Sequence, residues 1–250
     1  MIAAELYTLR ERLRDPDAIA AGLARMRDIG YDGVELAGLG PIEAGRLGGL
    51  LSETGLFACS AHVRWERLRD ETDAVVDDCR TWGCGHVAVP VAPLDRRSAE
   101  GYAQFAVEAS AVAARLHQAG VRLAYHNHAY ELQRYGRENG LEILYRASDP
   151  ALLDAQIDTY WIQYGGGNPA AWIRRLHGRA PSVHLKDMDV SGGDPVMAEV
   201  GEGNLDWADV LEACRDAGVG WLIVEQDVCR RDPFESLAIS LRNLHALGAG

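Results

Sequence analysis

The chain alternates from end to end between short apolar runs rich in β-branched residues and longer amphipathic stretches. A run of roughly four to eight such residues predicts a buried strand, and the amphipathic stretch that follows predicts a helix packed against it. Eight strand–helix units can be counted, with strands expected at residues 3–9, 33–36, 57–62, 86–91, 121–126, 153–159, 182–186 and 221–226. Parallel strands joined by helices form an open sheet or a closed barrel, so the alternation restricts the fold to these two.

The number of units favours the closed form. A (β/α)8 TIM barrel usually takes about 250 residues, which is the length of this chain. An open doubly wound sheet usually carries a G-x-G-x-x-G turn after its first strand, but the segment from Arg10 to Leu13 contains no glycine. The sequence also lacks a long linker or low-complexity tract. We therefore predict an α/β protein with a single TIM-barrel domain over residues 1–250.

Several of the expected helices carry start and stop signals. Asn168-Pro169 and Asp232-Pro233 each fit a capping residue followed by proline in the first helical position, and Glu235 extends the second pair to a capping-box pattern. Helix ends are expected at glycines that lie shortly before the next strand, namely Gly30, Gly55, Gly120 and Gly218.

Composition and charge exclude several classes of protein. Apolar residues make up 48% of the chain and charged residues 25%, as is usual for a globular protein with a large core. The net charge of -12, without any run of lysine or arginine, repels a nucleic-acid backbone. No apolar stretch approaches the roughly 18 residues of a membrane span, and residues 1–17 lack the apolar region of a signal peptide. We expect a cytoplasmic protein that binds neither nucleic acid nor membranes.

Polar side chains gather at the ends of the last four expected strands. The segments are Tyr125-His126-Asn127-His128, Ile157-Asp158, Val183-His184-Leu185-Lys186-Asp187 and Val224-Glu225-Gln226-Asp227. Substrates of TIM-barrel enzymes bind at this end of the strands. A set of carboxylates and imidazoles without thiolates suits one divalent metal, with Mn²⁺ the first expectation and Mg²⁺, Co²⁺, Fe²⁺ or Zn²⁺ as alternatives.

Each of these residues has a structural explanation when it is taken alone. Asp158 fits a helix cap, His184 between two apolar residues fits a core histidine, and Glu225 fits a surface position. Their recurrence at the same level on consecutive strands favours a shared role instead. We therefore expect Asp158, His184 and Glu225 to be metal ligands.

These motifs, in this order, resemble the sugar phosphate isomerase/epimerase family of xylose isomerase-like TIM barrels, which includes ketose 3-epimerases, inosose dehydratases and keto-sugar lyases. The resemblance covers nearly the whole chain. It is carried by the segments Gly30–Leu36, His126–His128 with Glu131, Asp158 with Trp161 and Gly165-Gly166, His184–Asp187, Gly201–Trp207 and Val224–Asp227.

The resemblance implies a metal bound by a glutamate from strand five, an aspartate from strand six, a histidine from strand seven and a glutamate from strand eight. Asp158, His184 and Glu225 match the last three, but His126 stands nearest to the usual strand-five glutamate. Glu131 is the first carboxylate after it. We expect Glu131 to fold back to the metal, with His126 or His128 as the alternative ligand.

The reaction that the resemblance implies is isomerisation or epimerisation of a sugar or keto-sugar through proton abstraction next to a carbonyl group. The metal lowers the cost of the enediolate, so that the carboxylate of Glu225 is a sufficient base. Because a histidine replaces the expected strand-five glutamate, His126 and His128 would serve on the other face of the substrate. A histidine acid also fits β-elimination from a 3-keto-sugar, a keto-glycoside or an inosose, which we keep as the alternative.

Further residues are expected to bind the substrate, which we take to be a sugar or a cyclitol. Lys186 would neutralise a developing oxyanion or bind a carboxylate, although a surface lysine paired with Asp187 explains it equally well. Glu35 and His62, at the ends of strands two and three, and Trp161 would contact substrate hydroxyls or a sugar face. The resemblance further implies a homo-oligomer.

Two other functions remain open at this point. An abasic-site endonuclease group shares this barrel, but it would need additional ligands for several zinc ions and a basic groove, which the charge of -12 disfavours. A non-catalytic sugar-binding protein would hold no tight metal.

Overall fold

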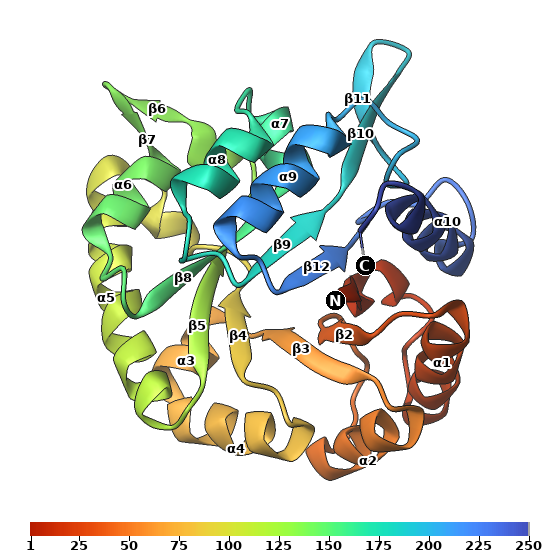
Figure 1. Cartoon of the computed structure of the whole chain (residues 1–250). Helices are drawn as coiled ribbons and strands as arrows, with labels where there is room; N and C mark the ends of the chain where they lie inside the picture. Colours follow the sequence, from red (N-terminus) through yellow and green to blue (C-terminus); the bar gives the residue numbers. More distant parts are fainter. Residues whose placement is uncertain (250) are drawn as a thin grey trace.

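The computed structural model describes residues 1–249 and consists of a closed barrel of eight parallel strands surrounded by helices (Figure 1). The barrel strands are β1 (Ile2–Glu5), β2 (Gly33–Leu36), β3 (Phe57–His62), β4 (His86–Val89), β5 (Arg122–His126), β8 (Leu153–Asp158), β9 (Ser182–Leu185) and β12 (Trp221–Val224). Each strand pairs with its neighbours in chain order, and β1 pairs with β12 to close the ring. The predicted (β/α)8 barrel is confirmed.

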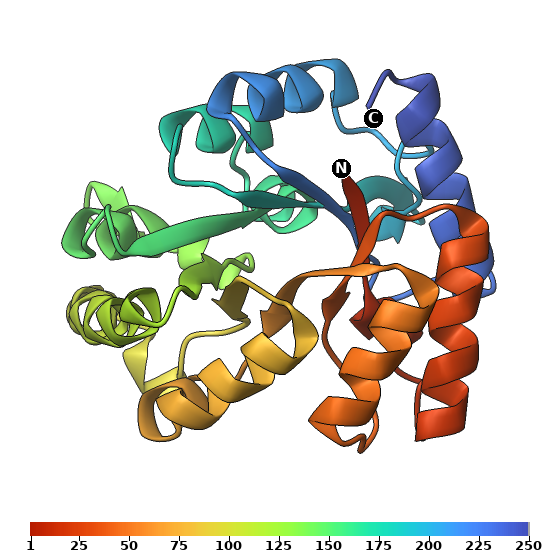
Figure 2. The ribbon, with the colours of Figure 1, turned by 60° about the horizontal axis from the view of Figure 1, so that its bottom comes forward.

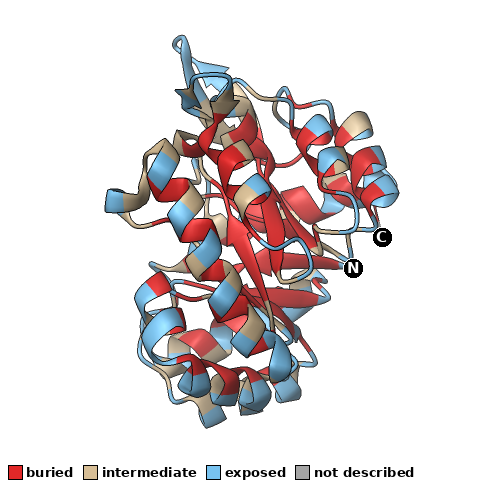
Figure 3. Ribbon diagram, turned by 90° about the vertical axis from the view of Figure 1, so that its left-hand side faces the viewer, coloured by how far each residue is buried: buried red, intermediate tan, exposed pale blue. Residues whose placement is uncertain are grey.

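The helices form an outer layer around the strands (Figure 2). They are α1 (Pro16–Ile29), α2 (Ala44–Thr54), α3 (Trp65–Asp70), α4 (Thr72–Trp82), α5 (Ala99–Gln118), α6 (Gly140–Ala147), α7 (Thr159–Tyr164), α8 (Pro169–Arg175), α9 (Trp207–Ala217) and α10 (Pro233–Ala246), with short 3-10 helices η1 (Leu6–Leu9), η2 (Leu94–Arg96) and η3 (Tyr130–Leu132). Their inner faces and the barrel strands are buried, while their outer faces are exposed (Figure 3). Within residues 1–249, no helix is long and apolar enough to cross a membrane.

The predicted helix signals act as expected. Asn168 accepts a hydrogen bond from the backbone N–H of Ala171 at the start of α8, and Asp232 accepts two at the start of α10. Left-handed glycines with positive φ end α1, α2 and α9 at Gly30, Gly55 and Gly218, and Gly120, also with positive φ, follows the cap of α5.

The first strand is shorter than predicted. We expected a strand over residues 3–9, but β1 ends at Glu5 and residues 6–9 form the 3-10 helix η1. Leu6 and Leu9 lie three residues apart, so they fall on the same side of a 3-10 helix, and both are completely buried. Their burial explains why the run resembles a longer strand.

Two hairpins extend the loops at the C-terminal end of the barrel, and the sequence analysis predicted neither. The longer one pairs β10 (Asp187–Ser191) with β11 (Asp194–Ala198) and projects from the barrel (Figure 1). Its tip contains Gly192 and Gly193, both with positive φ. The shorter one pairs β6 (Arg134–Tyr135) with β7 (Glu138–Asn139) in the loop after β5.

A bulge in β3 decides which of its side chains enter the barrel. Val34 of β2 pairs with Ala58 while Glu35 pairs with Ser60, so Cys59 is an extra residue. A bulge shifts the alternation of a strand by one position. Cys59 therefore packs with the interior residues Ala3 and Ile223, and three residues later His62 also faces the interior.

Asp187, directly after β9, organises the loop that follows. Its carboxylate accepts hydrogen bonds from the backbone N–H groups of Met188, Gly201, Gly203 and Leu205 and from the indole N–H of Trp207. A Cβ on Gly203 would lie 2.4 Å from the Asp187 carboxylate, so this close approach requires glycine. The buried carboxylate thus connects β9, the long hairpin and α9.

We expect Asp187→Ala to lower the free energy of unfolding by about 3 kcal/mol, because several buried donors lose their charged acceptor together. Urea denaturation measures the change. The matched control is Asp189→Ala two residues away, whose partly exposed carboxylate contacts only the side chains of Asn204 and Arg230; it should cost about 0.5 kcal/mol. Equal losses in the two variants would show that the Asp187 network does not stabilise the loop.

Candidate functional site

Four side chains from consecutive strands of the barrel converge at its C-terminal mouth. They are His126 at the end of β5, Asp158 at the end of β8, His184 in β9 and Glu225 directly after β12, and one ligand atom of each lies within 4.8 Å of all the others. The register of the strands places these side chains at the same level of the barrel, because Asp158 pairs with His184 and His184 with Ile223. All four residues are buried, with at most 4% of their surface exposed. We call them the four-ligand group.

The donor set fits one divalent metal. Two imidazoles and two carboxylates are ligands that Mn²⁺, Fe²⁺, Co²⁺ and Zn²⁺ accept. His126 Nδ1 is buried without a hydrogen-bond partner among residues 1–249, which is costly unless a ligand satisfies it. Asp158 Oδ2 is also buried and lies 3.1 Å from the ammonium nitrogen of Lys186. Burial and the nearby His184 hold the pKa of His126 well below its usual value, so its imidazole is neutral, as metal binding requires.

Glu131 does not belong to the four-ligand group, contrary to the sequence prediction. It follows the turn after β5, where its carboxylate accepts hydrogen bonds from the Tyr125 hydroxyl and the His128 backbone N–H. Both oxygens are therefore used to hold the loop, and the residue is fully buried. Burial raises its pKa to about 7. The structure brings His126, the alternative, to the position where a strand-five ligand is expected.

Glu35 lies behind His184 and does not line the cavity at the mouth of the barrel. This corrects the prediction that it binds substrate. Its carboxylate accepts from His184 Nε2 at 2.6 Å and from the Gln156 amide at 2.7 Å, and its exposure is 0%. With Nε2 engaged, Nδ1 of His184, 2.9 Å from Glu225, is the nitrogen directed at the four-ligand group. A carboxylate behind a metal-binding histidine fixes the tautomer and orientation of its ring.

Glu5 is a member of the site that the sequence analysis missed. It ends β1 opposite Glu35, lies 3.0 Å from His62 Nδ1, and leaves Oε2 without a hydrogen-bond partner in the described chain. Burial and the negative charge of Glu225 raise its pKa to about 8. Glu5 lies inside the strand that the sequence predicts over residues 3–9, so the sequence does not mark it as a strand-end residue, whereas β1 ends at Glu5.

His62 connects these carboxylates on the side of β3. Its Nε2 lies 2.8 Å from the Gln156 side-chain oxygen and 3.4 Å from Glu35. Burial alone would lower its pKa, but Glu35 and Glu5 raise it to about 9. The ring retains 10% of its exposure and lines the cavity, so the predicted substrate contact is geometrically possible.

Lys186 is a buried cation and not a surface lysine. Its ammonium nitrogen lies 3.1 Å from Asp158, 2.7 Å from Glu225 and 2.7 Å from Asp227, and its side chain has 0% exposure. Burial alone would lower its pKa, but the three carboxylates raise it well above its usual value. The explanation that it pairs with Asp187 is wrong, because Asp187 binds backbone and indole N–H groups.

Aromatic side chains form the wall beside β5 and β8. The His128 ring stacks on Tyr130 with a centroid distance of 5.3 Å, and Trp161 lies at 5.3 Å from the same ring. Burial and the positive charge of Lys186 lower the pKa of His128 to about 3, so this imidazole is neutral. The predicted residues His128 and Trp161 are therefore both adjacent to the four-ligand group.

A cavity of about 540 Å³ opens over these residues. Its lining includes Glu5, His62, Arg97, His126, His128 and Glu225. The volume lies in the range of small-molecule sites, and the polar groups at its base can contact several hydroxyl groups at once. We call it the mouth cavity.

Comparison with known protein families identifies the family of this chain. The sequence model of the family described as xylose isomerase-like TIM barrel matches residues 23–244. Because this match covers most of the chain, the protein belongs to the xylose isomerase-like TIM-barrel family, as the resemblance of its motifs predicted.

Individual relatives fall within the same group. The chain is 25% identical over 265 aligned residues to the rhizopine catabolism protein MocC of Rhizobium meliloti, with 91% of this chain and 81% of MocC covered. A sugar phosphate isomerase/epimerase from Parabacteroides distasonis superposes with a TM-score of 0.83 at 19% identity, over 98% of this chain and 97% of its own. An L-ribulose 3-epimerase gives 0.72 at 17% identity, over 98% and 93%. At these identities the structural matches show the shared fold.

Substitution of Glu35 tests whether its carboxylate positions the His184 ring for metal binding. We expect Glu35→Gln to weaken Mn²⁺ binding about 10- to 100-fold, because the amide is a poorer acceptor for the His184 N–H and no longer fixes the ring. Titration against a chelator measures the affinity, and circular dichroism monitors folding. Glu43→Gln, on an exposed carboxylate at the start of α2, is the control and should leave Mn²⁺ affinity unchanged. Unchanged affinity in Glu35→Gln would rule out the positioning role.

The raised pKa of Glu131 predicts a specific dependence of stability on pH. Since folding raises this pKa from 4.5 to about 7, the stabilising effect of the bound proton is complete below pH 4.5 and is lost as pH rises through 7. Glu131→Gln removes that dependence. Relative to wild type, the variant should therefore gain about 2 to 3 kcal/mol in unfolding free energy between pH 5 and pH 8, measured by urea denaturation. A difference that stays constant with pH would contradict the assignment.

Proposed function

We propose that this protein binds one divalent metal, Mn²⁺ in the first instance, through His126, Asp158, His184 and Glu225, and removes a proton next to the carbonyl group of a sugar-like ketone. The observation that carries the proposal is the four-ligand group itself. One of its atoms, His126 Nδ1, is buried without a hydrogen-bond partner among residues 1–249, and two of its members, His126 and Glu225, line a cavity large enough for a monosaccharide. Membership of the xylose isomerase-like family supports the same chemistry.

The metal, when bound, supplies Lewis-acid polarisation of the carbonyl oxygen, which lowers the cost of removing the neighbouring proton by several kcal/mol. Glu225 is the base. Burial alone would raise its pKa, but Lys186 and His184 hold it well below its usual value, so the carboxylate is ionised over the whole working range of pH. Lys186, 2.7 Å from Glu225, adds a second positive charge beside the group, which favours an oxyanion that forms there.

The fate of the carbanion decides the reaction class. Return of a proton to the opposite face of the same carbon gives epimerisation, and proton transfer between the two oxygens and the two carbons gives isomerisation. Both need a second acid–base group across the substrate, for which His62 and His128 line the mouth cavity. Isomerisation or epimerisation of a keto-sugar is our first assignment.

β-Elimination is the second candidate, and one observation favours it. The strand-five member of the group is the imidazole of His126, so the group has no carboxylate at the strand-five position for a symmetric exchange of the proton with Glu225. In elimination Glu225 takes the proton, the C–H electrons form a C=C bond, and the C–O bond to the leaving group breaks. The departing oxygen then takes a proton from an acid at the mouth, for which His62 lines the cavity with a pKa raised to about 9.

Proton abstraction can be tested directly by solvent exchange. The Mn²⁺-loaded protein is incubated in D₂O with D-fructose, methyl 3-keto-β-D-glucoside or an inosose. Proton NMR follows the signal of the hydrogen on the carbon next to the carbonyl group. We expect exchange with at least one of them, and a decrease of about 100-fold or more in Glu225→Gln, because a positioned base typically contributes this much. Asp189→Asn, on the projecting hairpin, is the control and should exchange at the wild-type rate.

The products separate the two reaction classes. A deuterated epimer or isomer supports the first assignment, whereas an unsaturated ketone with new ultraviolet absorbance supports elimination. Metal analysis of each variant shows whether a slow rate reflects a lost base or a lost metal. The absence of exchange with all three ketones in the metal-loaded wild type would contradict the proposed function.

A further inference from the structure

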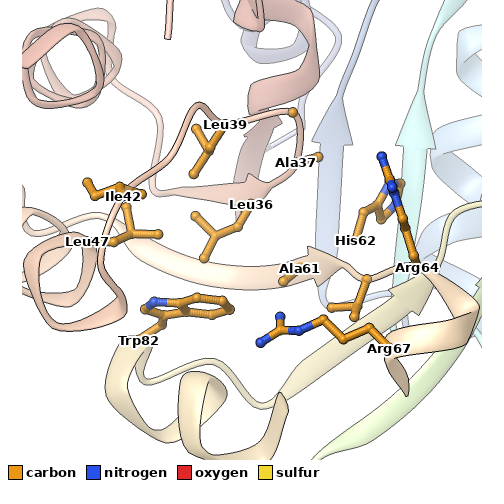
Figure 4. A pocket seen from close by; sticks show the side chains of 12 residues that line it. Leu36, Ala37, Leu39, Ile42, Leu47, Ala61, His62, Arg64, Arg67 and Trp82 are labelled. Atoms are coloured by element: carbon orange, nitrogen blue, oxygen red, sulfur yellow. The ribbon is translucent and has the colours of Figure 1, made fainter. Parts of the chain in front are cut away.

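A second cavity lies beside the mouth cavity, outside the barrel wall. It has a volume of about 310 Å³ and lies between the loops after β2 and β3 and the helices α2 and α4. Figure 4 shows its side chains, with Leu36 and Leu47 on one side, the Trp82 ring on the other and Ala61 along β3. Leu39 and Ile42 from the loop after β2 complete the wall. We call it the apolar crevice.

The apolar crevice opens onto the mouth cavity. The two share four lining residues, namely Ala37, Gly38, His62 and Arg64. In Figure 4, His62 and Arg64 stand together at the end of the crevice that faces the barrel. The crevice therefore adjoins the mouth cavity on the side of His62, next to the place where a molecule bound at the four-ligand group would lie.

The walls of the crevice select an apolar group. They consist mostly of aliphatic side chains and one indole, with His62, Arg64 and Arg67 at the edge, whereas the mouth cavity also has the carboxylates of Glu5, Glu225 and Asp227 in its lining. The Arg67 guanidinium at its side is already paired with Asp78 and Glu71. A second polyol would leave its hydroxyl groups largely without partners here, which disfavours a purely carbohydrate ligand.

The Trp82 ring forms one wall of the crevice. Aromatic rings pair favourably in offset-stacked or edge-to-face arrangements, so an aromatic group of the occupant would pack against this indole. An aromatic ring therefore fits both kinds of wall, since it packs against the aliphatic side chains and against the indole.

We propose that the apolar crevice binds an aromatic aglycone of the substrate, so that the physiological substrate is an aryl glycoside of the keto-sugar and not a free monosaccharide. The inference rests on the proposed function, because it places the sugar ring at the four-ligand group. The volume is about twice the roughly 150 Å³ that accommodates benzene in an engineered protein cavity, which leaves room for a substituted ring.

The test compares two ligands that differ only in the aglycone. Dissociation constants of methyl and 4-nitrophenyl 3-keto-β-D-glucoside are measured by calorimetry on the Mn²⁺-loaded protein. We expect the nitrophenyl glycoside to bind at least about tenfold more tightly, as burial of an aromatic ring predicts. The Ile42→Trp and Leu39→Trp variants fill the crevice from half-buried loop positions that tolerate a larger side chain. In both variants, the ratio of the two dissociation constants should fall to about twofold or less, while the methyl glycoside binds as tightly as it does to the wild type.

Leu94→Trp is the matched control, because Leu94 is 78% exposed in η2. It should keep the full difference between the two glycosides. Equal dissociation constants in the wild type, or a difference that persists in both filled variants, would overturn the crevice assignment while binding and exchange of the methyl glycoside still support the proposed function. Binding of neither glycoside would contradict both proposals.

Discussion

The burial of many ionisable groups at one level of the barrel is the constraint on which the site depends. Closing eight strands removes water from the mouth, so carboxylates and imidazoles there must neutralise one another or bind a cation. Lys186 offsets Asp158, Glu225 and Asp227, and His62 offsets Glu5 and Glu35. His126 Nδ1 and Glu5 Oε2, which are buried without a hydrogen-bond partner among residues 1–249, mark where this mutual compensation is incomplete and where a ligand is stabilised most.

The same balance of charge distinguishes the side chains that hold other residues in position from those suited to act as a base or a ligand. Glu35 and Glu131 are as deeply buried as the four-ligand group, but the oxygens of each accept hydrogen bonds from the protein. Glu35 accepts from His184 and Gln156. Glu131 accepts from Tyr125 and His128. Both glutamates hold other residues in position. Glu225 is kept ionised by Lys186 and His184, which suits a base, while the neutral imidazoles of His126 and His128 suit a ligand and a cavity wall.

The two adjoining cavities extend this division to the substrate. The mouth cavity presents polar groups suited to hydroxyl and carbonyl oxygens, and the apolar crevice presents Leu36, Leu47 and Trp82. Leu36 of β2 and Ala61 of β3 line the crevice, while the adjacent side chains along these strands, Glu35 and His62, face the interior of the barrel and belong to the site. The bulge at Cys59 sets this alternation, and with it the relation between the two cavities.

The sequence by itself determined the barrel and three of its convergent side chains, because strand–helix alternation and the position of a residue at a strand end are local properties. Asp158, His184 and Glu225 could be found in this way. Only the tertiary structure decided that His126 joins them, that Glu131 folds away, that Glu5 is part of the site, and that Glu35 holds His184 in place. Those outcomes depend on the hydrogen bonds of the turn after β5, on the early end of β1 and on the register between β2 and β3. Such contacts join residues far apart in the chain or compete within one loop, and no periodic pattern in the sequence records which contact has the lower free energy.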